Sequence, residues 1–217
     1  MIATVIFDFD GTIINTNELI KEGLNMIAIK NRGCKLTLME VEILTGKTLE
    51  AQMAYIDATQ VDSHVAEFRR WYEQNHDEMA RPFPGMVHLI RVLNELGYKI
   101  GIVTNNSRLA LDMGLKLLSI DQWIDCSITR DDVIETKPSP EGILKALSIL
   151  EMDTDQALFI GDTAHDILAA KAANVNSALV GWSQLSPEMR EQISPDHIFG
   201  SAEEVLDIII ETNYDVA

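Results

Sequence analysis

The sequence predicts an α/β fold built on a parallel β-sheet, and three observations lead to that prediction. Short apolar runs, mostly rich in β-branched residues, recur along the chain and end at polar residues or glycine, which is typical of buried parallel strands. Segments with apolar residues at helical spacing separate these runs, as expected where helices flank a parallel sheet. One long stretch after the first run lacks this alternation and is helical throughout. The five predicted strands are residues 2–7, 98–103, 124–128, 157–160 and 177–180.

Local signals mark the ends of the helices expected between these strands. Residues 86–96 carry apolar residues at helical spacing and stop at Gly97, and glycine is common just after a helix. Ser139 followed by Pro140 predicts an N-cap and a first helical residue. Ser201 opens a capping-box pattern for the last helix. The helices predicted in this part of the chain are residues 86–96, 109–118, 141–150, 164–173 and 202–210.

A helical insert follows the first strand. From residue 17 to residue 81 the sequence shows helical patterns and no convincing strand. It then reads Arg-Pro-Phe-Pro-Gly at residues 81–85, which is typical of a stiff connection rather than the interior of a helix or strand. We therefore predict a core of residues 1–15 and 82–217 and a helical domain of residues 16–81. Its predicted helices are residues 17–30, 37–46, 49–56 and 62–78.

The charge balance and the cysteines argue against several classes of protein. With 17 Lys and Arg against 34 Asp and Glu, the formal net charge is −17, which disfavours nucleic-acid and anionic membrane partners because both bind basic patches. No apolar run approaches the ~20 residues of a membrane-spanning helix, and the N-terminus lacks the features of a signal peptide. Cys34 and Cys126 are far apart and outside any metal-binding spacing, so we expect a cytoplasmic protein without disulfides.

The first strand ends in the run Asp-Phe-Asp-Gly-Thr at residues 8–12. Because side chains alternate along a strand, Asp8 and Asp10 are expected on the same side at its carboxyl end. Two close carboxylates repel each other and favour a cation, and magnesium prefers oxygen ligands. Gly11 permits a sharp turn that brings backbone N–H groups near a ligand. An ordinary Asp-Gly turn is the alternative, whereas a calcium loop fails because Ile13 and Leu19 replace its glycine and glutamate.

Polar residues follow other predicted strands as well. Thr104 and Asn105 follow the second strand, where a hydroxyl and backbone donors suit a phosphoryl oxygen. Lys137 precedes a proline and a capped helix. Asp162 and Asp166 lie four residues apart across a strand-to-helix turn, which can aim both carboxylates at one cation. Each feature alone also has an ordinary explanation, as a loop, a surface lysine or acids that complement a helix dipole, so their combination carries the weight.

Taken together and in their order along the chain, these acidic, threonine, asparagine and lysine residues resemble the motifs of the haloacid dehalogenase superfamily of phosphatases. The resemblance implies a Rossmann-like sheet with strand order 5-4-1-2-3 and a small all-helical cap inserted after strand 1. Ligands of such open sheets bind outside the carboxyl ends of the strands where the order reverses. The motifs that carry it are Asp8-x-Asp10-Gly11-Thr12, Thr104-Asn105, Lys137-Pro138 and Gly161-Asp162-x-x-x-Asp166.

The resemblance also implies a mechanism. Asp8 would attack phosphorus and form an aspartyl-phosphate. Asp10 would protonate the leaving oxygen and then deprotonate the water that hydrolyses the intermediate. Lys137 would offset negative charge, while Thr104 and the Asn105 N–H would hold the phosphate.

Magnesium is the cofactor that the resemblance implies. Its ligands would be the Asp8 carboxylate, the Asp10 backbone carbonyl and the Asp162 carboxylate. Asp166 would be either a further ligand or a residue that supports the ligands without binding the ion. Local cations of this kind answer the difficulty that an acidic chain poses for an anionic substrate.

The substrate is less clearly indicated than the reaction. Family members that cleave carbon–halogen bonds lack an aspartate two residues after the nucleophile, so Asp10 implies a phosphatase or phosphomutase. In the insert, Lys47 in the predicted loop of residues 45–48 is a candidate substrate contact, with a solvated lysine as the alternative. A P-loop is excluded because Val41 stands where glycine is needed.

Closer similarity to the phosphoglycolate phosphatase-like branch, and within it to the bacterial pyrophosphatase type, is carried by residues 13–20, 113–117 and 131–133. It implies 2-phosphoglycolate or pyrophosphate as substrate. A sugar-phosphate phosphatase, a phosphomutase or a non-enzymatic regulator phosphorylated on aspartate remain as alternatives. We expect a small anionic phosphorylated substrate, no nucleic-acid or membrane partner, and a monomer or homodimer.

Overall fold

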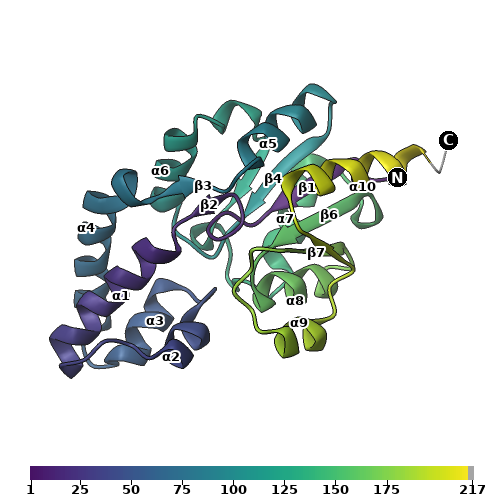
Figure 1. The fold of residues 1–217 in the computed structure, drawn as a ribbon. Coiled ribbons are helices and arrows are strands. Elements are labelled where there is room, and N and C mark those ends of the chain that lie inside the picture. The colour runs from purple at the N-terminus through teal and green to yellow at the C-terminus, as the bar shows by residue number, and fades with distance from the viewer. Residues whose placement is uncertain (215–217) are drawn as a thin grey trace. The chain divides into compact units, whose positions relative to one another are not determined.

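The fold is that of a computed structural model, which describes residues 1–214 (Figure 1). The chain forms two compact units by contact density, one of Met1–Ile14 with Pro82–Ala217 and the other of Asn15–Arg81. We call them the sheet unit and the helical unit. The two connecting segments contain the short strands β2 (Ile14–Asn15) and β3 (Arg81–Pro82).

The sheet unit is built on six parallel strands in the order β5-β4-β1-β6-β7-β8. The predicted α/β class is confirmed, but the strand order differs in detail from the predicted 5-4-1-2-3. Numbered 1 to 6 along the chain, these strands lie in the order 3-2-1-4-5-6, so a sixth strand extends the sheet beyond the fifth. The strands are β1 (Thr4–Phe7), β4 (Lys99–Val103), β5 (Cys126–Ile128), β6 (Ala157–Gly161), β7 (Asn176–Val180) and β8 (His197–Phe199).

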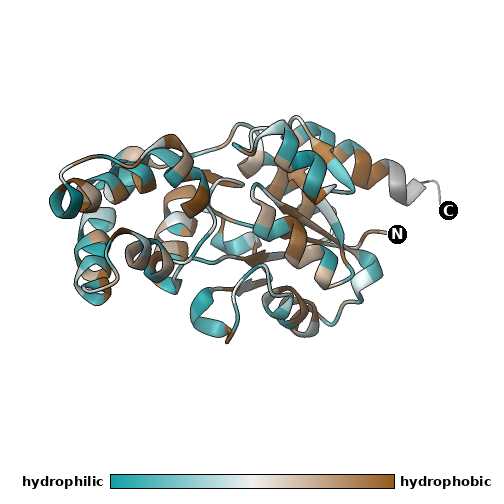
Figure 2. Ribbon diagram, turned by 90° about the horizontal axis from the view of Figure 1, so that it is seen from below, coloured by the Kyte–Doolittle hydropathy of each residue, from teal (hydrophilic) through white to brown (hydrophobic). Residues whose placement is uncertain are grey.

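Strand β1 is central and buried on both faces. All four of its residues are buried, although consecutive side chains point to opposite faces of a sheet. Val5 lies beside Ile100 of β4 and Leu158 of β6. Figure 2 shows hydrophobic colouring concentrated in these strands. Helices must therefore cover both faces, as in other parallel sheets.

The helices of the sheet unit supply this cover. On one face, Ile143 and Leu147 of α7 pack in one cluster with Ile6 and Phe159, and burial of each such side chain contributes about 1.5–3 kcal/mol. The helices are α5 (Met86–Glu95), α6 (Arg108–Leu118), α7 (Glu141–Leu150), α8 (Ala164–Ala172), α9 (Pro187–Ile193) and α10 (Ala202–Tyr214), with short 3₁₀ turns η1 (Asp121–Trp123), η2 (Arg130–Asp132) and η3 (Thr154–Gln156).

Two details of this part differ from the sequence prediction. Helix α7 spans the predicted residues 141–150, but its N-cap is Pro140 and not the predicted Ser139. The Ser139 hydroxyl still accepts a hydrogen bond from Glu141 N, at 3.3 Å. Helix α9 was not predicted, although it begins with an N-cap serine followed by proline, because its seven residues are too few to show a clear period.

The helical unit contains four helices among its residues, as the sequence predicts. Their apolar faces meet in a core that includes Leu24, Ile27, Met53 and Phe68. Gly23 lies in the closest part of this packing, since a Cβ there would be 2.7 Å from the Phe68 ring. The helices are α1 (Asn17–Arg32), α2 (Leu38–Leu44), α3 (Leu49–Ile56) and α4 (Val61–Met79).

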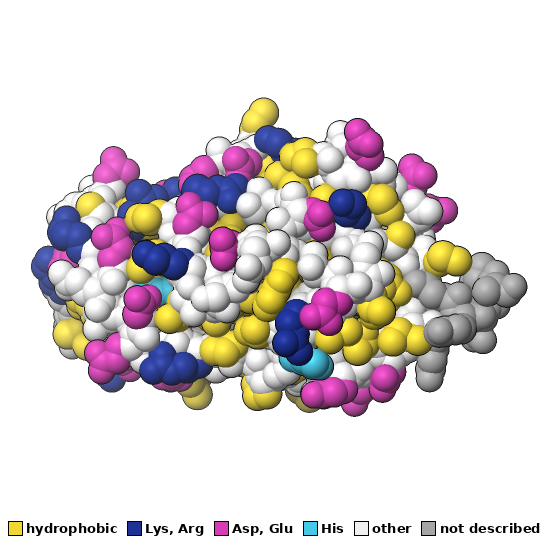
Figure 3. All heavy atoms as spheres, turned by 90° about the horizontal axis from the view of Figure 1, so that it is seen from above, with side chains coloured by type: hydrophobic (Ala, Val, Ile, Leu, Met, Phe, Trp, Pro, Cys, Tyr) yellow, Lys and Arg dark blue, Asp and Glu magenta, His cyan; other side chains and the backbone are white. Residues whose placement is uncertain are grey.

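Charged side chains cover much of the surface. Figure 3 shows basic and acidic side chains interspersed on one face of the molecule. In the helical unit, Lys30 pairs with Glu67 and Arg32 with Glu40, both at 2.7 Å. Among the described residues, no helix is both long and apolar enough to cross a bilayer.

Candidate active site

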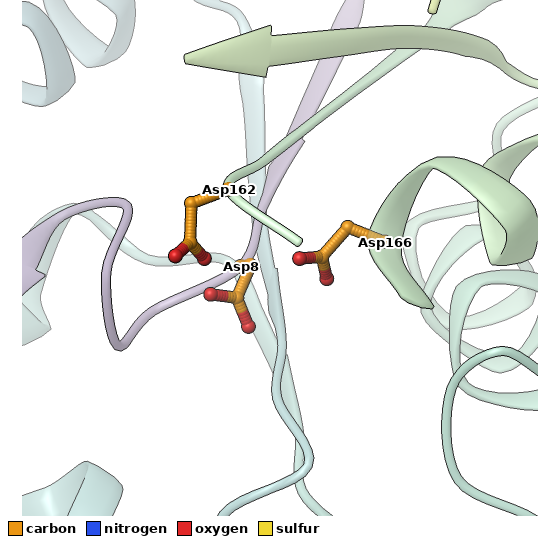
Figure 4. Close-up of side chains that lie close together, drawn as sticks. All are labelled: Asp8, Asp162 and Asp166. Atoms are coloured by element: carbon orange, nitrogen blue, oxygen red, sulfur yellow. The ribbon is translucent and has the colours of Figure 1, made fainter. Parts of the chain in front are cut away.

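The carboxyl ends of three neighbouring strands bring predicted site residues together. Asp8 follows β1, Thr104 follows β4 and Asp162 follows β6, and β1 lies between the other two strands. Parallel strands end at the same edge of a sheet, and the chain order reverses at β1. Figure 4 shows the carboxylates of Asp8, Asp162 and Asp166 turned toward a common space. Oxygen atoms of these three buried residues lie within 4.8 Å of one another.

Lys137 lies at the centre of this group. Its Nζ donates to Asp8 Oδ1 and Asp166 Oδ1, both at 2.6 Å, and to the Val103 carbonyl at 2.8 Å. An ammonium group has three donors, and these contacts use all of them. The side chain of Lys137 is only 4% exposed. Lys137 is thus a fixed buried cation, although it lies 129 residues from Asp8 along the chain.

Negative charge exceeds positive charge in this cluster. Burial raises the pKa of Asp8 to about 7; Lys137 opposes that rise and Asp166 adds to it. Burial, followed by repulsion from Asp8 and Asp166, also raises the pKa of Asp162 well above its usual range. Burial alone lowers the pKa of Lys137, but the carboxylates of Asp166 and Asp8 outweigh it and raise that pKa. The ammonium therefore stays charged, and the remaining negative charge of the site would be offset by a further cation.

The residues present fit a magnesium ion. The available groups are carboxylate oxygens, which suit a hard divalent cation, and such a cation offsets the excess negative charge. Gly11 (φ +87°) lets the turn pass close to one of these groups, since a Cβ there would lie 2.2 Å from Asp162 Oδ2. Any larger residue at position 11 would displace the Asp162 carboxylate. Gly11 N–H donates to the Ile14 carbonyl at 2.8 Å, so its contribution in this conformation is the turn itself.

Two threonines hold the acidic residues in place. The Thr12 hydroxyl lies within hydrogen-bond distance of Asp8 Oδ2 (3.3 Å) and Asp162 Oδ1 (3.4 Å). Thr163 donates to Asp166 Oδ2 from its backbone N–H at 2.9 Å and from its hydroxyl at 2.6 Å. Both oxygens of Asp166 are therefore bound to donors of the protein. Thr163 was missed by the sequence analysis, although Thr-x-x-Asp at a helix start is a recognisable capping-box pattern.

The loop after β4 contacts two other parts of the site. The Asn105 side chain donates to the Lys137 carbonyl and accepts from the Lys137 N–H, both at 2.9 Å. Asn106 donates from Nδ2 to Asp10 Oδ2 at 3.0 Å, and its own N–H donates to the Thr104 hydroxyl at 3.1 Å. Asn106 is a site residue that sequence reasoning missed, although it directly follows the predicted pair.

The remaining predicted residue, Lys47, belongs to the helical unit. It lies in the turn between α2 and α3, next to Gly46, whose φ of +77° makes that turn sharp. The structure thus gathers Asp8, Asp162, Asp166 and Lys137 in one buried cluster and ties Asp10, Thr104 and Asn105 to the loops around it.

Comparisons with known proteins agree with this geometry. A family model described as haloacid dehalogenase-like hydrolase matches residues 5–180. The chain is 34% identical over 212 residues to the pyrophosphatase PpaX of Bacillus mycoides strain KBAB4, covering 98% of this chain and 99% of that protein.

Solved structures show the same fold over nearly the whole chain. A candidate haloacid dehalogenase-like hydrolase from Bacteroides fragilis superposes with a TM-score of 0.85 at 25% identity, covering 93% of this chain and 98% of the other. A candidate phosphoglycolate phosphatase from Lactobacillus plantarum superposes with a TM-score of 0.84 at 26% identity, covering 95% and 99%.

Proposed function

The chain belongs to the haloacid dehalogenase-like hydrolase family, and from that premise we propose a magnesium-dependent phosphatase that works through an aspartyl-phosphate on Asp8. One observation carries the proposal: a buried carboxylate at the end of the central strand, bound on one oxygen by Lys137 and on the other by Thr12. A carboxylate held in one orientation beside a fixed cation is suited to attack phosphorus in line with the leaving group.

The first step transfers the phosphoryl group to the enzyme. An Asp8 oxygen forms a bond to phosphorus, and the bond from phosphorus to the leaving oxygen breaks. Asp10, two residues beyond the nucleophile and partly exposed, gives its proton to that oxygen. Lys137 keeps its charge and offsets the negative charge that gathers on the phosphoryl oxygens, because its raised pKa lies far above neutrality.

The second step releases phosphate. A water molecule attacks the phosphorus of the aspartyl-phosphate, and the bond from phosphorus to the Asp8 oxygen breaks. Asp10, now ionised, takes the proton from this water, which returns the enzyme to its starting state. The Thr104 hydroxyl accepts from Asn106 N–H, so its own proton is suited to hold a phosphoryl oxygen.

Asp8 and Asp162 are the side chains that would hold magnesium, together with the Asp10 backbone carbonyl. When bound, the ion supplies positive charge to the phosphoryl oxygens. Asp166 orients Lys137 instead, because its oxygens accept three hydrogen bonds of 2.6–2.9 Å, from Lys137 and from Thr163 N–H and hydroxyl. Asp8 accepts one short bond, from Lys137, and only a longer contact of 3.3 Å from Thr12. This arrangement favours the indirect role among the two that the sequence left open for Asp166.

We propose a small phosphorylated substrate, with pyrophosphate and 2-phosphoglycolate as the first candidates. The relative with 34% identity is a pyrophosphatase, and a structural neighbour is a candidate phosphoglycolate phosphatase. The helical unit would act as the cap that selects the substrate, with Lys47 as a candidate contact. The free thiols of Cys34 and Cys126 are consistent with the reducing cytoplasm that we propose as the compartment.

The test is phosphate release from pyrophosphate, 2-phosphoglycolate and sugar phosphates, with magnesium and with chelator. We expect magnesium-dependent release from at least one small substrate and none from Asp8→Asn, which keeps the shape of the side chain but removes the nucleophile. Asp112→Asn is the matched control, because Asp112 is an exposed residue of α6. No release from any substrate, or full activity in Asp8→Asn, would contradict the proposal.

A further inference from the structure

We propose that Asn106 is a positioning residue that holds Asp10 in place for proton transfer, an inference that rests on the function proposed above. The Asn106 side-chain amide donates to Asp10 Oδ2 at 3.0 Å. The two residues are 96 positions apart and follow neighbouring strands, because β1 pairs with β4. The hydrogen bond thus joins the turn that carries Asp10 to the loop beyond the next strand.

Asn106 is itself held by hydrogen bonds at every polar group. Its N–H donates to the Thr104 hydroxyl at 3.1 Å, and its carbonyl accepts from Arg130 N–H, also at 3.1 Å. Its side-chain oxygen accepts from Ser107 N–H at 2.9 Å. With the bond to Asp10, both nitrogens and both oxygens of Asn106 have a hydrogen-bond partner, so Asn106 is a rigid support rather than a mobile surface side chain.

The neighbours also determine which way the amide points. A backbone N–H, such as that of Ser107, only donates, so it requires the amide oxygen of Asn106. An ionised Asp10 carboxylate only accepts, so it requires the amide nitrogen. A flipped amide would lose both hydrogen bonds at once. The donor that faces Asp10 is therefore fixed by a contact on the other side of the same side chain.

Asp10 has more need of such support than Asp8. Asp8 is 6% exposed and bound to Lys137, whereas Asp10 lies in the turn just before Gly11 and is partly exposed. A general acid must reach the leaving oxygen within hydrogen-bond distance, and small displacements reduce the rate strongly. A donor to Oδ2 restricts the orientation of the carboxylate without supplying or taking a proton.

A purely structural role for Asn106 is the alternative, because Ser107 is the N-cap of α6. The two roles use different atoms of the same amide: the oxygen supports the start of the helix, and the nitrogen contacts Asp10. Asn106→Asp separates them. It keeps an oxygen for Ser107 N–H, but it places a carboxylate oxygen against Asp10 in place of the donor. Asn106→Ala removes both contacts.

The kinetic test compares two leaving groups in a single turnover. The alkoxide leaving group of 2-phosphoglycolate must be protonated, whereas the carboxylate leaving group of acetyl phosphate need not be. We expect Asn106→Asp to slow leaving-group release from 2-phosphoglycolate by about 10-fold to 100-fold, which is part of the rate enhancement that a general acid supplies. Release from acetyl phosphate should change much less. If wild type prefers pyrophosphate, that substrate replaces 2-phosphoglycolate.

Asn94→Asp is the matched control, since Asn94 is an exposed residue of α5 and the substitution changes the net charge equally. We expect it to match wild type with both substrates. Equal losses with both leaving groups in Asn106→Asp, or wild-type kinetics in that variant, would overturn the proposal. A structural role predicts a loss in Asn106→Ala but none in Asn106→Asp.

A second measurement needs no turnover. The side-chain amide protons of Asn106 should give an NMR resonance shifted by the Asp10 carboxylate, and Asp10→Ala should abolish that shift. An unchanged resonance in Asp10→Ala would overturn the contact itself. Absence of wild-type turnover with an intact Asn106 shift would contradict the proposed function instead, so the two failures are distinguishable.

Discussion

The sheet unit and the helical unit bury polar side chains in different ways. In the sheet unit, Asp8, Lys137 and Asp166 are charged groups joined by short hydrogen bonds at one edge of the sheet. In the helical unit, His64 and His76 are buried within the helix packing, and Nε2 of each makes no hydrogen bond. Buried carboxylates are thus gathered where strands end, whereas His64 and His76 lie among helices, beside the carboxylates of Asp57 (3.6 Å) and Asp77 (2.8 Å).

This difference between the two units indicates which of them holds groups suited to catalysis. Burying several charges close together is costly unless they are paired, so the acidic cluster of the sheet unit calls for a chemical explanation. Buried polar residues of the helical unit instead support its own backbone, since Gln52 donates to the Leu44 carbonyl and Asn25 accepts from Leu36 N–H. We therefore propose that the reaction takes place in the sheet unit and that the helical unit selects the substrate.

The largest expected effect separates the two units directly. Asp8→Asn should lower kcat for every substrate by at least about 10³-fold, because it removes the nucleophile. Lys47→Ala should change kcat/KM for the preferred substrate by about 10-fold or less, as loss of one partly exposed charged contact would. Steady-state kinetics on both variants checks this. Equal effects of Asp8→Asn and Lys47→Ala would contradict the proposal that the sheet unit carries out the reaction and the helical unit selects the substrate.

The next largest effect concerns stability. Lys137→Met leaves the buried carboxylates of Asp8 and Asp166 without their ammonium and should lower the free energy of unfolding by about 3–5 kcal/mol in chelator. Urea unfolding measures it. Lys116→Met, on the exposed side of α6, is the control and should stay within about 0.5 kcal/mol of wild type. A change no larger than that of the control would mean that the cluster does not depend on Lys137.

A packing substitution probes the helical unit. Gly23→Ala places a Cβ where it would lie 2.7 Å from the Phe68 ring. Overpacking of this kind should lower the free energy of unfolding by about 1–3 kcal/mol, measured by guanidinium unfolding. Gly33→Ala is a less crowded comparison, since a Cβ at Gly33 meets no atom within 4 Å, although its φ of +76° adds strain. Unchanged stability in Gly23→Ala would contradict the close packing of α1 against α4.

The smallest expected effect depends on pH. Partial burial acts to raise the pKa of Asp132, but hydrogen bonds from Thr129 and Arg108 outweigh it and lower that pKa. A carboxyl with a lowered folded-state pKa stabilises the fold above its unfolded-state pKa of about 3.9, and this contribution is lost as the pH falls through the folded value. Asp132→Asn should therefore cost about 1 kcal/mol at pH 7, since Asp132 is one-third exposed.

That difference between wild type and Asp132→Asn should disappear in acid, below the lowered pKa. Unfolding at pH 7 and at successively lower pH, with the exposed Asp155→Asn as control, provides the measurement. A difference that grows toward low pH would have the wrong sign for this account.

Much of the sheet unit could be predicted because its signals are local. The run at residues 8–12 lies at the end of a strand whose apolar residues are consecutive, so both the strand and the place of Asp8 follow from a few neighbouring residues. The predicted family and phosphatase class are confirmed by the family model and the relatives. The sixth strand β8 was missed because it has only three residues, of which Ile198 is exposed.

The rest of the site could not be predicted because its contacts join distant parts of the chain. No local pattern shows that Asn106 reaches Asp10 or that Lys137 lies between Asp8 and Asp166. The N-cap of α7 was assigned to Ser139 instead of Pro140 because proline is common at the first helical position and Ser139 precedes it. The role of Lys47 depends on what the helical unit binds, and the sequence there shows a lysine beside the turn glycine Gly46 without indicating a ligand.

The most direct test of the account is to trap the phosphorylated enzyme. Wild type is mixed with magnesium and its preferred substrate, quenched in acid within milliseconds, and digested for mass spectrometry. We expect one phosphoryl group on the peptide that contains Asp8, and none in Asp8→Asn. Substrate turnover without any phosphoryl group on that peptide would contradict it.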